Sequence, residues 1–231
     1  MVPKSSARRR GGLRRGKTLL RRAGLFLLGV LLPAALFLTP SLLRSPLPGP
    51  DPQVDALVRS VLPQGLDEAR RHFVLTACTL VGRVDYFWGG KSQALGWDRR
   101  WGKPALVTAG GGPESGERIP FGLDCSGYVT WTAVNAAGTK EAAHIAGDGV
   151  RAQYARCRPV DPGEVQSGDL AFFPDLSHVG IVAGRAADGT LLILHCSHSL
   201  GGVVLTSDGM TAGFTLFGTP DYYLLYGDRV P

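Results

Sequence analysis

The sequence lacks a Cys-x-x-Cys pair, and its four cysteines are far apart in the chain. Thioredoxin-like redox proteins and zinc ribbons depend on closely spaced cysteines, so neither class is indicated. One close set of metal-ligand types exists, at His195, Cys196 and His198. Because successive residues of a strand point to opposite faces, these side chains do not converge. We expect no metal site and no cofactor.

Acidic residues are missing from the first 44 positions, which carry ten lysines and arginines. From residue 45 onward, the remaining 15 basic residues face 19 acidic ones. The net charge of +6 therefore belongs to the N-terminal segment. Binding to a phosphate backbone depends on clustered basic side chains, so we expect no nucleic-acid partner for the rest of the chain.

Charge is also absent from residues 23–43, an apolar run of 21 residues. As a helix this run would extend about 31 Å, which matches the hydrocarbon thickness of a bilayer. The basic residues before it favour a cytoplasmic N-terminus. We predict that residues 1–44 form a basic cytoplasmic segment and a transmembrane signal anchor, with the domain outside the membrane. Cleavage as a signal peptide, followed by secretion, is the alternative.

The rest of the chain has the length and apolar content of one packed domain. Residues 45–65 are predicted to form a linker and a leading helix, and residues 66–231 the domain itself. Helical spacing over residues 51–82, interrupted by Pro63 and Gly65, predicts two short helices. A further helix is expected over residues 124–138.

Strand-forming runs appear after residue 168. They cover residues 169–173, 178–184, 191–196, 203–206 and 222–227, with turn residues between them. Helices followed by a series of strands predict an α+β fold with an antiparallel sheet.

Cys125 would occupy the first turn of the helix at residues 124–138, directly after Asp124 as N-cap. Unpaired N–H groups and the helix dipole at that end favour a thiolate, which is the nucleophilic form of cysteine. Gly122 and Gly127 would keep the approach open for a substrate backbone. These residues alone leave a catalytic and a structural role open for Cys125. Structural thiols are the expected role of Cys78, Cys157 and Cys196.

A cysteine nucleophile needs a base, and the base needs a third group that fixes it. His178 opens a predicted strand after a turn. If Gly184 and Gly189 flank a four-residue hairpin loop, His178 lies opposite His195 on one face of the sheet. His198 would then fall on the other face or beyond the strand end. Each histidine taken singly is also compatible with a structural role.

Five segments stand out by their order and separation. They are YFWGG at residues 86–90, FGLDCSGYVTW at 121–131, SGDLAFF at 167–173, SHVGIVAG at 177–184 and LLILHCS at 191–197. Together they resemble the NlpC/p60 cell-wall cysteine peptidases over about residues 66–227. The resemblance implies a papain-like α+β fold, in which N-terminal helices and a nucleophile-bearing helix pack on an antiparallel sheet. The stretch between Gly90 and Phe121 is longer than is usual in that family.

The resemblance implies a Cys-His-His triad with Cys125 as nucleophile, His178 as base and His195 as the residue that orients the base. It also implies the reaction, which is hydrolysis of an amide bond in a peptidoglycan stem peptide, between D-isoglutamyl and a diamino acid. An amidase or acyltransferase on the same fold, and an inactive wall-binding module, are the alternatives.

Three further site residues follow from the same resemblance. Tyr86 would bring its hydroxyl near the oxyanion, while Asp124 and Ser126 would line the pocket for the stem peptide. The expected partner is peptidoglycan, at the outer face of a bacterial cell membrane, and no metal or organic cofactor is implied. The oligomeric state stays open.

Overall fold

The computed structural model describes residues 46–227 apart from residue 48. The membrane span predicted at residues 23–43 lies outside the described residues. Within the described part, none of the helices has the length and apolar character needed to cross a bilayer.

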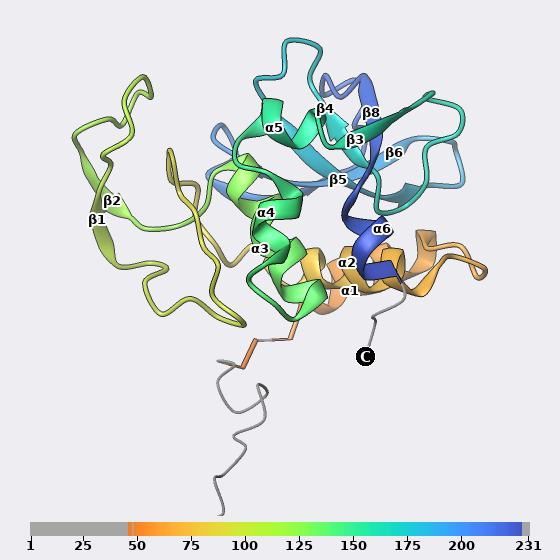
Figure 1. Ribbon diagram of the computed structural model, residues 1–231, viewed down its shortest axis with the longest axis horizontal. Helices are drawn as coiled ribbons and strands as arrows, with labels where there is room; N and C mark the ends of the chain where they lie inside the picture. Colours follow the sequence, from red (N-terminus) through yellow and green to blue (C-terminus); the bar gives the residue numbers. More distant parts are fainter. Residues whose placement is uncertain (1–45, 48, 228–231) are drawn as a thin grey trace, which may run out of the picture. The chain divides into compact units, whose positions relative to one another are not determined.

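Helices precede most of the sheet, as predicted. The helices are α1 (Pro52–Val61), α2 (Glu68–Cys78), α3 (Cys125–Ala137), α4 (Ala142–Ala146), α5 (Val150–Tyr154) and α6 (Tyr222–Tyr226). The strands are β1 (Pro104–Leu106), β2 (Arg118–Pro120), β3 (Cys157–Val160), β4 (Leu170–Phe172), β5 (Val179–Arg185), β6 (Leu191–Ser197), β7 (Gly202–Thr206) and β8 (Leu216–Pro220). The last six form an antiparallel sheet in the order β3-β8-β4-β5-β6-β7, while β1 and β2 pair separately (Figure 1). The fold is α+β.

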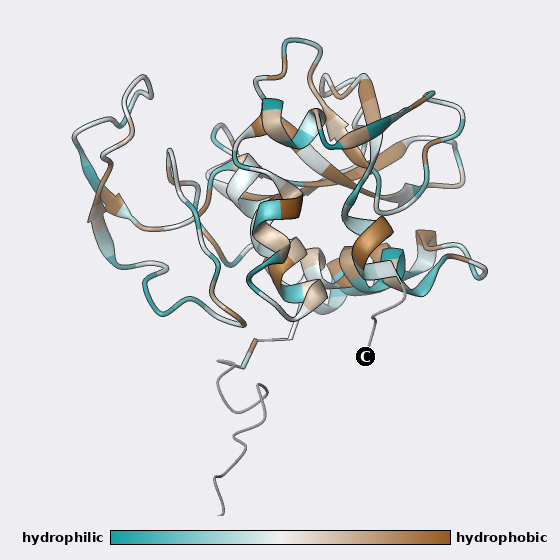
Figure 2. Cartoon of the chain, in the orientation of Figure 1, coloured by the Kyte–Doolittle hydropathy of each residue, from teal (hydrophilic) through white to brown (hydrophobic). Residues whose placement is uncertain are grey.

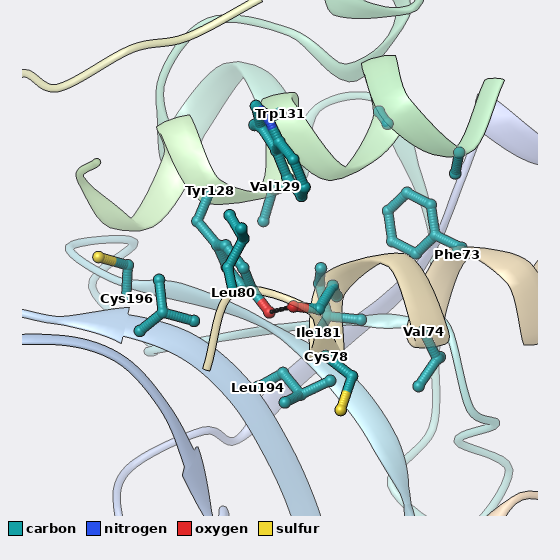
Figure 3. Packing of buried hydrophobic residues seen from close by; sticks show 14 of the residues in the cluster. Phe73, Val74, Cys78, Leu80, Tyr128, Val129, Trp131, Ile181, Leu194 and Cys196 are labelled. Carbon is teal, nitrogen blue, oxygen red and sulfur yellow. Dashed lines mark hydrogen bonds between the residues drawn. The ribbon is translucent and has the colours of Figure 1, made fainter. Parts of the chain in front are cut away.

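The main hydrophobic cluster lies between the sheet and the helices α2 and α3 (Figure 3). Tyr128 and Trp131 of α3 are fully buried there, and the Tyr128 hydroxyl donates to the Ala77 carbonyl at 2.9 Å, which joins α3 to α2. A smaller cluster that includes Ile193 and Phe214 contains side chains from the opposite face of the sheet. Strands β5 and β6, which contribute to both clusters, are mostly apolar (Figure 2).

Helix α3 confirms the expected limits at both ends. The Asp124 carboxylate accepts from the Gly127 N–H at 2.5 Å, and Gly138 follows the helix in the left-handed conformation with φ 70°. Every residue from Cys125 to Ala136 is buried. A helix enclosed on all sides has little freedom to shift, so its first residue is held in a defined position.

The strand predicted at residues 222–227 is wrong, because this segment forms α6. A short apolar run does not distinguish a strand from a helix, and packing decides here in favour of the helix. Tyr222 and Tyr226 lie one turn apart, stack at 5.2 Å and are buried, while Leu224 is 82% exposed. Strand β8, which we did not predict from the sequence, lies between β3 and β4 in the sheet.

The predicted register of the β5–β6 hairpin is also wrong. Ile181 pairs with Leu194, whereas the predicted register would pair it with Leu192, and the ladder shifts between Val182 and Gly184. The loop between the strands is accordingly longer than the four residues expected. A shift of two residues keeps each side chain on its face, so the predicted facing of the two histidines survives the error.

Gly122 and Gly127 do not keep space open for a substrate, as the sequence had suggested. A Cβ atom on Gly122 would lie 1.8 Å from the Asp85 carbonyl oxygen, and one on Gly127 would lie 2.1 Å from the Gly90 carbonyl oxygen. The chain's own segment 85–90 therefore occupies that space and lies directly against the start of α3.

Because of this close contact, we expect a side chain at Gly122 to destabilise the folded protein. Gly122→Ala forces the backbone apart, so we expect the free energy of unfolding in urea to fall by about 1–3 kcal/mol. Gly163→Ala is the matched control, because Gly163 is exposed and a Cβ atom added there would have no other atom within 4 Å. Equal unfolding midpoints for the two variants would contradict the close packing.

Candidate active site

Cys125 lies where the start of α3 meets the start of β5. It is 7% exposed, and the backbone N–H groups of Ser126 and Val179 are directed at its sulfur. Val179 is the first residue of β5 and directly follows His178. Two segments that are distant in sequence thus bring the predicted nucleophile and the predicted base to the same place.

His178 and His195 form a hydrogen-bonded pair. His178 Nε2 lies 2.8 Å from His195 Nδ1, and His195 Nε2 lies 2.7 Å from the Thr206 hydroxyl. Gly180 stands beside His195, since a Cβ on Gly180 would lie 3.1 Å from His195 Cβ. The missing side chain leaves room for His178 to reach diagonally across the two strands. Thr206, which the sequence did not single out, completes the chain of contacts.

Two aromatic rings pack against this pair, in which His195 is buried and His178 is partly buried. The ring centroid of Phe173 lies 5.0 Å from that of His178, and the centroid of Phe214 lies 5.4 Å from His178 and 5.2 Å from His195. Burial lowers the pKa of His178 to about 4 and that of His195 to about 3. Both imidazoles are therefore neutral at pH 7.

Burial opposes the thiolate form that the helix end was expected to favour at Cys125. Burial, assisted by the nearby Asp124 carboxylate, raises the pKa of Cys125 to about 11. The backbone N–H groups of Val179 and Ser126 act in the opposite direction and are outweighed. Cys125 is consequently a neutral thiol at pH 7 in the free protein.

Tyr86 and His198 lie beside this centre. Tyr86 forms a bridge to Leu123, its ring meets the His198 ring edge-on at 5.0 Å, and burial raises its pKa, which keeps the hydroxyl protonated. His198 follows the end of β6 and contacts the Glu114 carboxylate. Of the two histidines in this strand region, His195 is the one that contacts His178, as predicted.

A cavity of about 530 Å³ opens onto the histidine pair. Its walls include Tyr86, Trp88, Pro113, His178, His195 and His198. The Trp88 indole N–H donates to the Gly110 carbonyl at 3.0 Å and joins the wall to the long loop. The stretch between Gly90 and Phe121 thus contributes Pro113 to the wall of the cavity.

Asp124 and Ser126 are tied to a residue that the sequence did not single out. Lys91 Nζ donates to Asp124 Oδ1 at 2.9 Å and also to the Ser126 hydroxyl. The Ser126 hydroxyl donates to the same carboxylate oxygen at 2.9 Å. Only the position of Lys91 after the glycine pair of YFWGG could have drawn attention to it.

The remaining thiols lie apart from any metal-binding arrangement. Among the residues that the structure describes, no group of three or more His, Cys, Asp or Glu side chains could hold a metal ion. All four cysteines are free: Cys78 and Cys196 are buried, and Cys157 is partly buried. The Cys196 thiol contacts the Leu123 carbonyl oxygen at 3.0 Å, which is a structural contact.

Residues 82–213, more than half of the chain, match the NlpC/P60 family. The chain belongs to the NlpC/P60 family. Its α+β fold and antiparallel sheet are those expected from the resemblance.

Several solved NlpC/P60 structures are similar to this chain. The peptidoglycan hydrolase RipB from Mycobacterium tuberculosis is 24% identical, with a TM-score of 0.47 over 73% of this chain and 71% of that chain. The P60 domain of antigen MAP1204 from M. avium subspecies paratuberculosis is 22% identical, with a TM-score of 0.46 over 66% and 94%. RipD from M. tuberculosis, described as a non-catalytic NlpC/p60 domain protein, is 18% identical, with a TM-score of 0.44 over 65% and 95%. A comparison with curated proteins finds no significant match.

The buried histidine pair makes the stability of this NlpC/P60 domain depend on pH. In the unfolded chain both histidines take up protons below about pH 6.5, whereas in the folded protein they do so only near about pH 4 and 3. Unfolding therefore takes up protons as the pH falls from 7 to about 5, and the free energy of unfolding decreases by up to about 1.4 kcal/mol per pH unit for each histidine. We expect His195→Gln to show a clearly shallower slope in urea titrations over this range. Identical slopes would contradict the burial of His195 as a neutral group.

Proposed function

We propose that this protein is a cysteine endopeptidase that hydrolyses amide bonds in peptidoglycan stem peptides, at the bond between D-isoglutamyl and a diamino acid. The observation that carries the proposal is the contact of 2.8 Å between His178 and His195 at the strand end where the Cys125 thiol lies. Membership of the NlpC/P60 family supports thiol hydrolase chemistry. RipB, a similar chain, is itself described as a peptidoglycan hydrolase.

The role of His178 as base requires one arrangement of protons along these contacts. In it, His178 Nε2–H donates to His195 Nδ1, and His195 Nε2–H donates to the Thr206 hydroxyl oxygen. This arrangement leaves His178 Nδ1 free to accept a proton. His195 and Thr206 then fix both the tautomer and the ring orientation of the base.

The reaction begins from two neutral partners. As the Cys125 sulfur attacks the amide carbonyl carbon, its proton passes to His178 Nδ1. The carbonyl oxygen becomes an oxyanion, which the Cys125 backbone N–H at the start of α3 and the Tyr86 hydroxyl stabilise. Asp124 and Ser126 line the pocket for the stem peptide beside the nucleophile.

Three proton transfers complete the turnover. When the C–N bond breaks, His178 gives its proton to the leaving amine and a thioester with Cys125 remains. Water then attacks the thioester while His178 accepts a proton from it. The C–S bond breaks, the product leaves with a new carboxyl group, and the proton returns to Cys125.

The proposed location of the domain rests on the charge of the N-terminal segment. The nine basic residues before the apolar run at residues 23–43 support a single-pass anchor in a bacterial membrane, with the domain facing the wall. Secretion after cleavage of this segment is the alternative. Either arrangement brings the domain to its polymer substrate.

The first test is removal of the nucleophile. Cys125→Ala removes only the sulfur, so we expect it to abolish the release of soluble wall peptides, measured by mass spectrometry of digested peptidoglycan, while the domain stays folded. Cys157→Ala, which removes a partly buried thiol from β3, is the matched control and should keep wild-type activity. The identity of the new termini separates an endopeptidase from an amidase or acyltransferase.

Two results would reject the mechanism. Release of peptides by Cys125→Ala at close to the wild-type rate would exclude Cys125 as nucleophile. Binding of the wild-type protein to peptidoglycan without hydrolysis would identify a wall-binding module instead, which is the function described for RipD.

The second test concerns the orienting residue. His195 lies between His178 and Thr206, so His195→Ala lets the base ring drift, and we expect turnover to fall by roughly 10² or more. His195→Gln should retain part of the activity. His198→Ala removes a ring that contacts Glu114 and Tyr86, and it should stay within about threefold of wild type. A larger loss at His198 would reverse the assignment.

A further inference from the structure

Lys91 lies outside the proposed triad and yet contacts both residues that flank Cys125. Its ammonium group donates to Asp124 Oδ1 at 2.9 Å and to the Ser126 hydroxyl, and it lies 3.7 Å from Asp148 Oδ1. The Lys91 side chain is 36% exposed and that of Asp124 12%, whereas that of Asp148 is 92% exposed. The pair with Asp124 is therefore the better shielded from solvent and the stronger of the two.

The backbone determines where the ammonium group lies. The Asp124 N–H donates to the Gly90 carbonyl at 3.0 Å, and the same carbonyl contacts the Cα of Gly127 closely enough to exclude a side chain. Gly90 and the first turn of α3 are thus joined by main-chain contacts. Because Lys91 directly follows Gly90, these main-chain contacts place it beside Asp124, the N-cap residue of α3.

Lys91 also lines a second cavity, of about 350 Å³, together with Arg156 and His144. Such a cavity could be taken for a subsite for an anionic group. The Lys91 ammonium, however, donates hydrogen bonds to Asp124 and Ser126 and forms a longer ion pair with Asp148, all within the chain. The Lys91 charge therefore interacts with side chains at the start of α3, and this cavity is not proposed as a ligand site.

The charge of Lys91 also acts on the Cys125 sulfur, because both residues that it contacts flank Cys125. The Asp124 carboxylate disfavours negative charge on Cys125, and the Lys91 ammonium favours it. His178, Tyr86 and Cys196 also face this site, and burial keeps each of them neutral at pH 7. Burial is the largest influence on the sulfur, and among the charged side chains Asp124 and Lys91 act on it in opposite directions.

We propose that Lys91 is a positioning residue that holds Asp124 and Ser126 at the first turn of α3 and neutralises the Asp124 carboxylate while negative charge develops on the Cys125 sulfur. The role in hydrolysis rests on the proposed function. The effect on the thiol itself does not, because it is present without a wall substrate.

The experiment measures alkylation of Cys125 by iodoacetamide in the full chain, at a fixed pH near 8, with peptide-level mass spectrometry to separate the four cysteines. Lys91→Met leaves the Asp124 charge unopposed, so we expect the alkylation rate of Cys125 to fall about tenfold, as for a rise of one unit in its pKa. Lys91→Arg should restore most of the rate, and Lys103→Met, which removes an exposed lysine from the same long loop, should not change it.

A double-mutant cycle separates neutralisation from a general loss of structure. Asn remains a good N-cap, so Asp124→Asn removes the charge and keeps the helix start. In that background Lys91→Met should change the alkylation rate less than about twofold. A tenfold loss in both backgrounds, or no loss in either, would overturn the proposal. If the wild-type protein alkylates as expected but does not hydrolyse peptidoglycan, the proposed function fails and the role of Lys91 at the thiol stands.

Discussion

The close contact between segment 85–90 and the start of α3 is the constraint on which the site depends. Gly122 and Gly127 leave no room for a side chain at this contact, because the carbonyl groups of Asp85 and Gly90 already fill the space. The contact brings Tyr86 beside Cys125 and carries Lys91 to the N-cap. These glycines therefore allow two segments of the backbone to pack closely, and they do not leave space for a substrate.

Burial then decides the protonation states at the site. Apolar rings around His178 and His195 disfavour the imidazolium form, and the enclosed start of α3 disfavours the thiolate of Cys125. Burial thus opposes both charged forms in the free protein, the thiolate of Cys125 and the imidazolium of His178.

Predictions from the sequence succeeded where the signal was local or periodic. The limits of α3 depend on Asp124 and Gly138, whose roles as caps are set by their own chemistry. The facing of His178 and His195 depends only on strand parity, which a shift of two residues does not alter. The strand prediction for residues 222–227 failed because a short apolar run fits a helix and a strand equally well.

By itself, the sequence determined the family motifs, the α+β class, the helix that begins at Cys125 and the pair of histidines that face each other. Only the tertiary structure decided that Lys91 and Thr206 belong to the site and that the thiol and imidazoles are neutral. The physical reason is distance along the chain. Caps and strand parity act over a few residues, whereas charge neutralisation and removal from water depend on groups that only folding brings together.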